Sequence, residues 1–582
     1  MNTRIYTKDV VNLNNTEVSI YGWVKKIRKL GNLIFFDLFD RYGIVQCFIN
    51  KDNPVFPIIQ DFDREDVVMI TGIVQKRKSI NENLLTGYYE INIKSAQLLN
   101  KAKTTPLIIE EETDATEDVR MQYRYLDLRR INNINTFHLR SRVSKIIRDF
   151  LHQRDFIETE TPILAKTTPE GARDFLVPTR SHKFYALPQS PQIFKQLLMV
   201  AGFDKYFQIT KCFRDEDLRS DRQPEFTQVD IEMSFIDEIT IQNLIEELMF
   251  DIFKSTKNIE LNLPFRRIDY KDAIDLYGSD KPDLRFDLRL HDGAVLFQKM
   301  KSDIFQKAFQ NNDTIKYLIV DKKLTKKEIE ILTKYARDKK AKGLFYMTVE
   351  NEKIVDGSMM KNDIDHLQFL SIFNHHKLKT GTILVITGAY EMVTTALGLV
   401  RVNLANILNL IKPDVFEFAW IVNWPLFVYD EEQKRYLAMH HPFTSPSAES
   451  LSTFDLTPEK AIGRNYDIVL NGYEVGGGSI RIVDQAVQER MFKTMGMDVD
   501  DAKIKFKYLL EAFQYGAPPH GGIALGLDRL MMILINTEYI RDVVAFPKNN
   551  NGIDMMLECP NVINDDELAI LGIKNNDCNE KQ

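Results

Sequence analysis

Three segments of the chain combine arginines, carboxylates and glycines in patterns that suit a polyanionic ligand such as a nucleotide. In the first, FRDEDLRSDRQPEF, Arg214 follows one strand-like run and Phe226 opens the next. Two antiparallel strands joined by this charged loop would hold Arg214 toward a phosphate, because a planar guanidinium pairs with oxyanions at two points. Phe226 could stack on a base. A solvated hairpin without a ligand is the alternative interpretation.

The second segment, NYDIVLNGYEVGGGSIRI, has the sequence pattern of a strand. It carries two carboxylates, Asp467 and Glu474, and Arg481 lies further along the same strand. Their odd spacing alone points them to opposite faces, and a bend or bulge at Asn471–Gly472 would restore a common face. On one face they could hold Mg²⁺, which usually takes one or two carboxylates plus substrate phosphates. The three glycines permit close approach of a ligand to the backbone. A glycine-rich bulge is the alternative.

The third segment, GGIALGLDRLMMIL, predicts a strand that ends at Gly526 and a helix that begins with LDRL. Arg529 would then lie in the first turn of the helix, where the positive end of the dipole already favours anions. A charged cap on a packing helix is the alternative. The three segments together indicate a nucleotide site more specifically than any one of them.

The N-terminal hundred residues supply a different element. Five Val/Ile/aromatic-rich runs, separated by glycine-containing breaks, predict a small closed barrel of the OB-fold type; they are 18–24, 32–40, 44–49, 66–75 and 87–93. The basic run KKIRK beside Phe35 and Phe36 would suit a platform on which single-stranded bases stack. A solvated edge strand with core aromatics is the alternative.

The rest of the sequence predicts the helices and strands that position these segments. A polar stretch at 101–118 reads as a linker, and 135–154 as a helix with one apolar face. The next run, FIETETPIL, alternates like a strand, but Pro162 places it at an edge or a boundary. Helix and edge strand together could form a subunit interface or simple domain packing. The expected apolar face consists of Val143, Ile146, Ile147, Phe150 and Leu151.

Bulk composition excludes several classes of protein. A formal net charge of −7 gives no global nucleic-acid signature, so any such binding must come from local patches. The mildly apolar stretch 381–400 contains the charged residue Glu391, which argues against a membrane span. The N-terminus does not show the sequence pattern of a leader peptide. We therefore expect a soluble cytoplasmic protein. The cysteines show no CxxC pair, which argues against a disulfide framework and against a zinc site; they are Cys47, Cys212, Cys559 and Cys578.

A resemblance to a known family covers nearly the whole chain. FRDE with its following Phe, and GIALGLDRL, look like motifs 2 and 3 of the class II aminoacyl-tRNA synthetases, and the block at 137–162 resembles motif 1, the dimerisation element. GYEVGGGSIR looks like the segment before motif 3. TPEGARDFLVP, QSPQIFKQ and AMHHPFT make the chain similar to the bacterial-type aspartyl-tRNA synthetase family. The signatures of class I synthetases and of phosphate loops are absent from the sequence.

The resemblance implies a multidomain α+β protein. It implies an OB-fold anticodon-binding domain at 1–105, a hinge at 106–130, and an antiparallel-sheet catalytic domain split between 131–280 and 421–560. An inserted α/β domain of the GAD type would occupy 281–420, and a C-terminal extension 561–582. The family's reaction has two steps: L-aspartate attacks ATP, with Mg²⁺ present, to give aspartyl-adenylate, and the aspartyl group then passes to the 3′ end of tRNA-Asp. The expected assembly is a homodimer.

The family's functional residues carry over to matching positions of this sequence. The catalytic group would be Arg214, Glu216 and Arg529. The ATP site would comprise Arg214, Asp215, Glu216, Gln223, Phe226, Glu474, Gly526, Leu527, Asp528 and Arg529. The aspartate site would comprise Glu170, Ser190, Gln192, Lys195, Arg214, Asp230, His440 and Arg481. The Mg²⁺ ligands would be Asp467 and Glu474, with no zinc, and the anticodon readers Arg28, Phe35 and Gln46.

The implied pocket should select aspartate on physical grounds. Asparagine is nearly isosteric but neutral, so it would leave the buried cations Lys195 and Arg481 unpaired. Truncating one partner of such a pair costs about 2–5 kcal/mol. Polar mismatches of this kind give about 10⁴–10⁵-fold discrimination without editing.

Several alternatives stay open on sequence alone. An asparagine- or lysine-specific synthetase shares the barrel and motifs, although the insertion and the pair of Lys195 and Arg481 argue against both. A nucleic-acid-binding protein with a retired catalytic half, or an amide-forming ligase on the same fold, would belong to another class. Leu30, near the anticodon readers, favours strict use of tRNA-Asp over joint use of tRNA-Asn. Ala389-Tyr390 departs from the Ala-Asp pair that relatives often carry in the insertion.

Overall fold

The computed structural model describes residues 4–167, 171–298, 303–358 and 366–574. It divides into two compact units. Unit 1 comprises Met1–Ser141, Leu218–Gln223 and Tyr539–Val562, and unit 2 comprises Arg142–Asp217, Pro224–Glu538 and Ile563–Gln582. The three chemically loaded segments identified above therefore fall mainly in unit 2, while the predicted barrel lies in unit 1.

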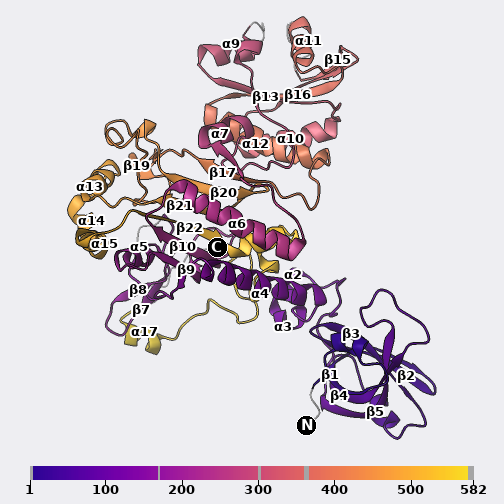
Figure 1. Ribbon diagram of the computed structural model, residues 1–582. Helices are drawn as coiled ribbons and strands as arrows, with labels where there is room; N and C mark the ends of the chain where they lie inside the picture. The colour runs from indigo at the N-terminus through magenta and orange to yellow at the C-terminus, as the bar shows by residue number, and fades with distance from the viewer. Residues whose placement is uncertain (1–3, 168–170, 299–302, 359–365, 575–582) are drawn as a thin grey trace. The chain divides into compact units, whose positions relative to one another are not determined.

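The predicted five-stranded barrel is confirmed in unit 1 (Figure 1). Its strands close in the order β1-β2-β3-β5-β4, with β3 and β5 parallel and the other pairs antiparallel. Alternate residues point inward, as the period of two requires; on β2 these are Ile34, Phe36 and Leu38. The elements are η1 Thr7–Asn12, β1 Glu17–Leu30, β2 Leu33–Asp40, β3 Gly43–Asn50, α1 Phe56–Gln60, β4 Val67–Lys76 and β5 Tyr89–Asn100.

A short helical segment follows the barrel in unit 1. It consists of α2 (Glu117–Gln122) and α3 (Arg124–Asp127), which lead into α4 (Ile131–His152). Arg124 of α3 donates from Nε to the Ala545 carbonyl at 2.9 Å and from Nη2 to the Val544 carbonyl at 3.0 Å. These bonds hold α3 against the late segment that contains η4 (Ile540–Asp542).

An eight-stranded sheet forms the centre of unit 2, in the order β11-β17-β20-β21-β22-β10-β9-β6. The inner neighbours pair antiparallel, while β11 with β17 and β6 with β9 pair parallel at the two edges. This is the antiparallel sheet that the resemblance implied. The strands are β6 Ile157–Glu158, β9 Lys205–Phe213, β10 Glu225–Ser234, β11 Arg266–Asp269, β17 Phe418–Val422, β20 Asn465–Leu470, β21 Tyr473–Ile480 and β22 His520–Gly526.

The predicted helix at 135–154 corresponds to α4, which begins earlier, at Ile131, and ends at His152. Val143, Ile147, Phe150 and Leu151 are buried on its apolar face, and Ile146 is half-buried. The expected strand after it is short, because pairing stops at Glu158, and Pro162 lies beyond it. It occupies a sheet edge, as the proline required.

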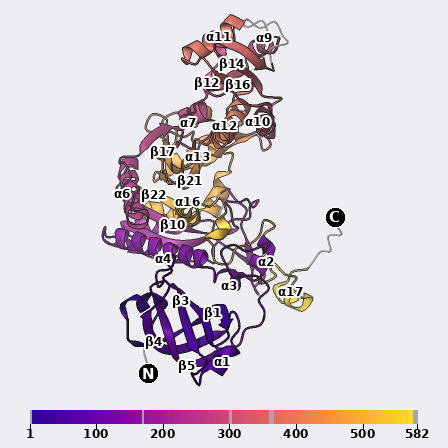
Figure 2. The ribbon, with the colours of Figure 1, turned by 90° about the vertical axis from the view of Figure 1, so that its right-hand side faces the viewer.

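A second sheet lies in the inserted segment, in the order β12-β13-β16-β14-β15, and every described pair in it is antiparallel. Helices α10 and α12 pack on one face, and the other face packs against α8, α9 and α11 (Figure 2). The apolar stretch 381–400 forms β16 and the start of α12, and no described helix is long and apolar enough to cross a membrane. The elements are β12 His291–Asp292, α8 Ala294–Phe297, α9 Asp303–Gln310, β13 Thr314–Val320, α10 Lys326–Asp338, β14 Phe345–Glu350, β15 Lys353–Gly357, α11 His366–His375, β16 Gly381–Gly388 and α12 Tyr390–Ile407.

The other described elements of unit 2 surround the large sheet or connect its strands. They are β7 Leu176–Pro178, β8 Phe184–Ala186, α5 Gln192–Val200, α6 Glu238–Lys257, α7 Tyr270–Tyr277, β18 Phe427–Asp430, β19 Arg435–Ala438, η2 Pro458–Lys460, α13 Gln485–Thr494, α14 Val499–Lys505, α15 Lys507–Ala512, η3 Phe513–Tyr515, α16 Leu527–Ile535 and α17 Asp565–Leu571.

Candidate active site

The antiparallel pair of β9 and β10 holds Arg214 at the point where the two strands separate. Its backbone N–H donates to the Pro224 carbonyl at 2.9 Å, which extends the ladder by one residue. The guanidinium lies 5.1 Å from the centre of the Phe226 ring, a cation–π distance. Nε of Arg214 is buried and has no hydrogen-bond partner among the described residues. A buried donor without a partner is costly, so this geometry suits an anionic ligand at Arg214.

The other motif residues of this loop are placed differently. Glu216 is exposed, and Asp215 receives Arg173 Nε at 3.1 Å. Gln223 lies in unit 1, where its amide pairs with the Lys548 backbone in both directions, at 2.9 and 2.8 Å.

The strand-to-helix prediction at Gly526 is confirmed. Gly526 is the N-cap of α16, and Arg529 lies in the first turn, with Nη1 donating to the Glu474 carbonyl at 2.5 Å. Leu527 is buried. Asp528 points back into the sheet, where its carboxylate accepts the Thr227 N–H at 2.7 Å and so fixes the strand beside Phe226.

The carboxylates Asp467 and Glu474 lie on neighbouring strands of one hairpin. The bend expected at Asn471–Gly472 is the hairpin turn itself, with both residues at positive φ (51° and 87°). The irregularity in register lies instead between Ile468 and Val469. The predicted bend is therefore present at Asn471–Gly472, as a turn between two strands rather than a bend within one strand.

Asp467 shows the electrostatic signs of a cation site. Burial, and then the charge of Glu474, raise the pKa of Asp467 well above its ordinary value. Its Oδ1 is buried without a hydrogen-bond partner among the described residues. A Cβ placed on Gly477 would lie 2.7 Å from that oxygen, so only glycine leaves the space beside it open. This donor set fits a hard divalent cation.

Four charged side chains form a buried cluster between α5, β10 and β21. Lys195 Nζ lies 2.8 Å from Asp230 Oδ1 and 3.2 Å from Glu232 Oε2. Arg481, just after β21, places Nε 2.9 Å from Glu232 Oε1 and Nη2 3.0 Å from Oε2. Two cations and two carboxylates balance in charge, so each member is held by a partner.

The pKa values of the two carboxylates in this cluster are shifted in opposite directions. Burial raises the pKa of Asp230, and Lys195 offsets this only in part. Burial also works against ionised Glu232, but Arg481 and Lys195 outweigh it and lower its pKa to about 2. Glu232 is therefore the permanent counter-charge, while Asp230 keeps a buried Oδ2 that has no hydrogen-bond partner among the described residues.

This cluster corrects the selectivity argument made from sequence. Glu232 already pairs both cations, so a neutral ligand would not leave Lys195 and Arg481 without a partner. The third nitrogen of the Arg481 guanidinium, Nη1, also has partners, since it lies 2.6 Å from Ser479 Oγ and 2.5 Å from His441 Nε2.

Two neighbouring histidines lie beside Arg481. Burial, followed by the charges of Arg481, Lys195 and Arg214, lowers the pKa of His440 to about 3, so its ring is neutral at physiological pH. The pKa of His441 is lowered well below its ordinary value, with burial again the first cause. Nδ1 of His440 is buried without a hydrogen-bond partner in the part of the chain that is described.

Three other residues were expected in the amino-acid pocket: Gln192, Ser190 and Glu170. Gln192, in α5, is buried and donates to Gln196 Oε1 at 3.1 Å. Ser190 is half-buried just before that helix. Glu170 lies outside the described residues.

On the barrel, the three predicted base-reading residues share one surface of β1, β2 and β3. Gln46 Oε1 accepts Arg28 Nη2 at 3.1 Å and Arg77 Nη2 at 2.9 Å, and its Nε2 donates to Glu90 Oε2 at 2.7 Å. The Gln46 amide is thus oriented by neighbours on both sides.

The aromatic residues beside this network divide between surface and core. Phe35 is half-buried and stacks with Phe48 at 5.9 Å. Phe36 is fully buried in the barrel core, which corrects the prediction that both could stack on bases. Leu30, at the end of β1, is exposed.

The comparisons with known proteins agree with this geometry. A family model described as tRNA synthetases class II (D, K and N) matches residues 116–550, and one described as an OB-fold nucleic acid binding domain matches 18–99. This chain is a class II aminoacyl-tRNA synthetase. The family resemblance found in the sequence is confirmed. The two matches together favour a tRNA synthetase over a nucleic-acid-binding protein with a retired catalytic half and over an amide-forming ligase.

The synthetase has close relatives along almost its full length. It is 59% identical over 558 residues to the aspartate–tRNA ligase of Ureaplasma parvum serovar 3, covering 96% of each chain. It is 46% identical over 569 residues to the aspartate–tRNA(Asp/Asn) ligase of Anoxybacillus flavithermus, covering 96% of this chain and 95% of that one. It belongs to the aspartate–tRNA ligase family. The solved asparaginyl-tRNA synthetase of Pyrococcus horikoshii shares the fold at a TM-score of 0.59 and 19% identity, covering 94% and 98% of the two chains.

Sequence reasoning missed several residues of the synthetase that contact the predicted site residues. Glu232 could have been found, because it lies two positions after Asp230 on one strand and so faces the same side. Phe48 carried the same signal, two positions after Gln46 on β3, and His441 directly follows His440. Arg77 and Glu90 had no comparable signal, since their partner Gln46 is distant in sequence.

The departure at Tyr390 lies in the inserted part of the synthetase. Tyr390 begins α12, and its hydroxyl lies 3.3 Å from Asp275 Oδ1, which also pairs with Lys316 Nζ at 2.8 Å. These contacts tie α12 to α7 and β13.

Proposed function

We propose that this synthetase activates L-aspartate with ATP and transfers the aspartyl group to tRNA-Asp. One observation carries the proposal: the buried guanidinium of Arg481 is fixed by Glu232 and lies beside His440 and His441, in one cluster with Lys195. A buried cation fixed in this way suits a carboxylate side chain. In the first step, the α-carboxylate of aspartate attacks the α-phosphorus of ATP and pyrophosphate leaves. In the second, a ribose hydroxyl at the tRNA terminus attacks the carbonyl and AMP leaves.

The residues of the site can be assigned to parts of the two substrates. The unpartnered Nε of Arg214 suits the α-phosphate, and Phe226 suits the adenine ring. Arg529, in the first turn of α16, suits the far phosphates. The unpartnered Oδ2 of Asp230 suits the α-ammonium of the amino acid, and Arg481 suits its side-chain carboxylate. Catalysis then consists of positioning and charge stabilisation, as adenylate formation requires.

Asp467 and Glu474 would hold Mg²⁺, the cation with which this class of enzymes generally uses ATP. Bound there, the cation neutralises phosphate charge and orients the polyphosphate. The protein's part is to keep two carboxylates side by side beside Gly477, where no side chain fills the space.

The barrel would bind the anticodon of tRNA-Asp. Phe35 offers a face for stacking, and Gln46, oriented by Arg28, Arg77 and Glu90, offers an amide to a base edge. Since the whole chain is acidic, we expect such local patches to carry the salt-sensitive part of tRNA affinity.

We also propose a homodimer acting in the cytoplasm. Exposed apolar side chains gather on and around β6, β7 and β8, next to the motif 1 segment. A patch of this kind on a soluble enzyme suits an interface with a second copy; its residues are Ile157, Ile163, Leu164, Leu176, Phe184 and Tyr185.

Aspartate-dependent ATP–pyrophosphate exchange tests the first step. We expect Arg481→Leu to abolish exchange while ATP binding stays measurable, because the variant removes the carboxylate partner and leaves the phosphate site. Arg464→Leu is the matched control, since Arg464 makes a similar two-point pair with Glu238, at 2.7 Å for both contacts, but is partly exposed. Normal exchange in Arg481→Leu would refute the assignment.

A second candidate, joint use of tRNA-Asp and tRNA-Asn, is favoured by the likeness to the Anoxybacillus flavithermus enzyme. Charging of both transcripts with aspartate in one assay separates the two. Charging of tRNA-Asp alone supports the strict enzyme, and charging of both supports the relaxed one. Charging of neither, with ATP and Mg²⁺ present, contradicts both.

A further inference from the structure

The barrel and the helical segment that follows it have separate hydrophobic cores. The barrel core contains residues of η1, α1 and β1–β5, with Ile5 and Leu13 packed against it. The helical segment has its own small cluster of Leu107, Ile109 and Leu126, packed against side chains of α2. The two apolar clusters are therefore separate, and the contacts between the two parts are polar ones and a ring contact of Tyr42 with His138 at 5.8 Å.

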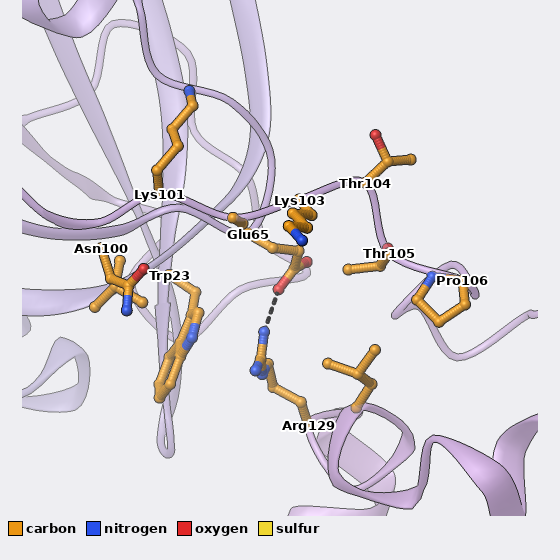
Figure 3. Close-up of a pocket in the computed structure, with 12 residues that line it drawn as sticks. Trp23, Glu65, Asn100, Lys101, Lys103, Thr104, Thr105, Pro106 and Arg129 are labelled. Atoms are coloured by element: carbon orange, nitrogen blue, oxygen red, sulfur yellow. Dashed lines mark hydrogen bonds and ion pairs between the residues drawn. The ribbon is translucent and has the colours of Figure 1, made fainter.

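A cavity of about 280 Å³ lies between these two parts (Figure 3). Trp23, Glu65 and Val67 of the barrel line one side, and Pro106, Leu126 and Arg129 line the other. Where this pocket opens, the two walls do not pack directly on each other, so the contacts that cross beside it help to hold the walls in place.

Glu65 makes the buried contact across this boundary. Its side chain is 2% exposed and lies 2.9 Å from Lys25 Nζ in β1 and 2.9 Å from Arg129 Nη1, just after α3. The Arg129 guanidinium also lies 4.9 Å from the Trp23 ring, and Lys25 donates to the Ile109 carbonyl at 3.3 Å. We call Glu65, Lys25, Arg129 and Trp23 the Glu65 cluster.

The backbone of Glu65 supports a specific role. Its φ is +69°, in the left-handed region that a residue with a side chain adopts at an energetic cost. A residue held in such a conformation needs support from its surroundings, and the two ion pairs of the Glu65 carboxylate supply it. Other contacts across the boundary are more exposed: Arg64 with Glu110 at 2.5 Å, and Arg41 with His138 at 3.1 Å.

We infer that Glu65 is a positioning residue for tRNA use: it fixes the barrel on the α2–α3 segment so that both ends of one tRNA engage together. The inference rests on the proposed role of the barrel in anticodon binding. Two linked binding sites raise each other's effective concentration only when their geometry permits simultaneous engagement. Loosening the Glu65 cluster should therefore raise KM for tRNA and leave aspartate activation unchanged.

Arg129→Gln is the main test, because Arg129 lies outside the barrel and its loss leaves Lys25 and Glu65 paired. We expect KM for full tRNA to rise about 10-fold with little change in kcat. ATP–pyrophosphate exchange and affinity for an isolated anticodon stem-loop should stay within about twofold, since the catalytic unit and the RNA surface of the barrel are untouched. Glu65→Gln should act in the same direction. Glu110→Gln is the control, because it removes an exposed ion pair with Arg64 at 2.5 Å in the same region.

Limited trypsin cleavage after Lys103, an exposed residue of the linker, gives a readout that does not depend on RNA. Faster cleavage in Arg129→Gln than in Glu110→Gln supports the inference. An unchanged cleavage rate, or an unchanged KM for tRNA, would overturn it, and so would an equal loss of stem-loop affinity, because the barrel's own surface would then be at fault. If the wild-type enzyme failed to bind the stem-loop, the anticodon proposal would fall while the cleavage rates still decided the role of Glu65.

Discussion

Glu232 receives Arg481 at two points, with Nε–Oε1 at 2.9 Å and Nη2–Oε2 at 3.0 Å, and both side chains are fully buried. The same carboxylate lies 3.2 Å from Lys195 Nζ. One residue that no ligand needs to touch therefore positions both cations of the candidate amino-acid pocket. Such a pair fixes the positions of its side chains more than it stabilises the fold, because the free-energy cost of removing the charges from water is about as large as their mutual attraction.

The first prediction concerns Glu232→Gln. The variant leaves Arg481 and Lys195 buried with one carboxylate between them, so kcat/KM for aspartate in the exchange assay should fall about 100-fold. The KM for ATP should change much less. Glu238→Gln is the control, because it breaks a two-point pair of the same type with the partly exposed Arg464. Equal activity of the two variants would show that Glu232 has no special role.

The second prediction concerns Arg214→Lys. Lysine keeps the charge but lacks the planar fork and the Nε donor that has no partner here. Loss of a preorganised donor to developing phosphate charge costs about 10²–10³-fold in rate, and we expect kcat for exchange to fall in that range. Arg219→Lys, at an exposed arginine of the neighbouring loop, should leave kcat unchanged. A wild-type rate in Arg214→Lys would contradict phosphate contact.

The third prediction concerns acid stability. The pKa of His440 is about 3 in the folded protein and 6.5 ordinarily, so between these values the unfolded chain binds a proton that the folded chain does not. The stabilising contribution of the neutral ring is complete above pH 6.5 and is lost as pH falls toward 3. Urea midpoints at about pH 7.5 and about pH 5 should therefore differ less in His440→Gln than in the wild type. His182→Gln, at an exposed histidine, should leave that difference as it is in the wild type.

The fourth prediction concerns the cation site. Because the pKa of Asp467 is raised, its ionisation beside Glu474 destabilises the fold as pH rises through that pKa. Asp467→Asn should melt a few degrees higher than the wild type in chelator at neutral pH. Adding Mg²⁺ should then raise the melting temperature of the wild type more than that of the variant. Identical melting of the two proteins, with and without Mg²⁺, would argue against a cation at these carboxylates.

Local patterns were sufficient for much of the fold. The barrel strands, the hairpin at Arg214, the helix after Gly526 and the apolar face of α4 all follow from periods of two or 3.6 and from glycine punctuation. The half-buried position of Phe35 and the buried position of Phe36 did not follow, because a one-residue step reverses the face and the register comes from pairing with β3.

The sequence by itself determined the class of chemistry: arginines and carboxylates at strand and helix ends, and the motifs that assign the family. Only the tertiary structure decided which charges neutralise one another. Glu232 is separated from Arg481 by 249 positions, and their contact exists because β10 and β21 both pair with β22 in one sheet. Lys195, 37 positions before Glu232, reaches the same carboxylate from α5. Electrostatic interactions depend on distance and burial rather than on position along the chain, so the two cations that Glu232 neutralises became visible only once the strands were placed.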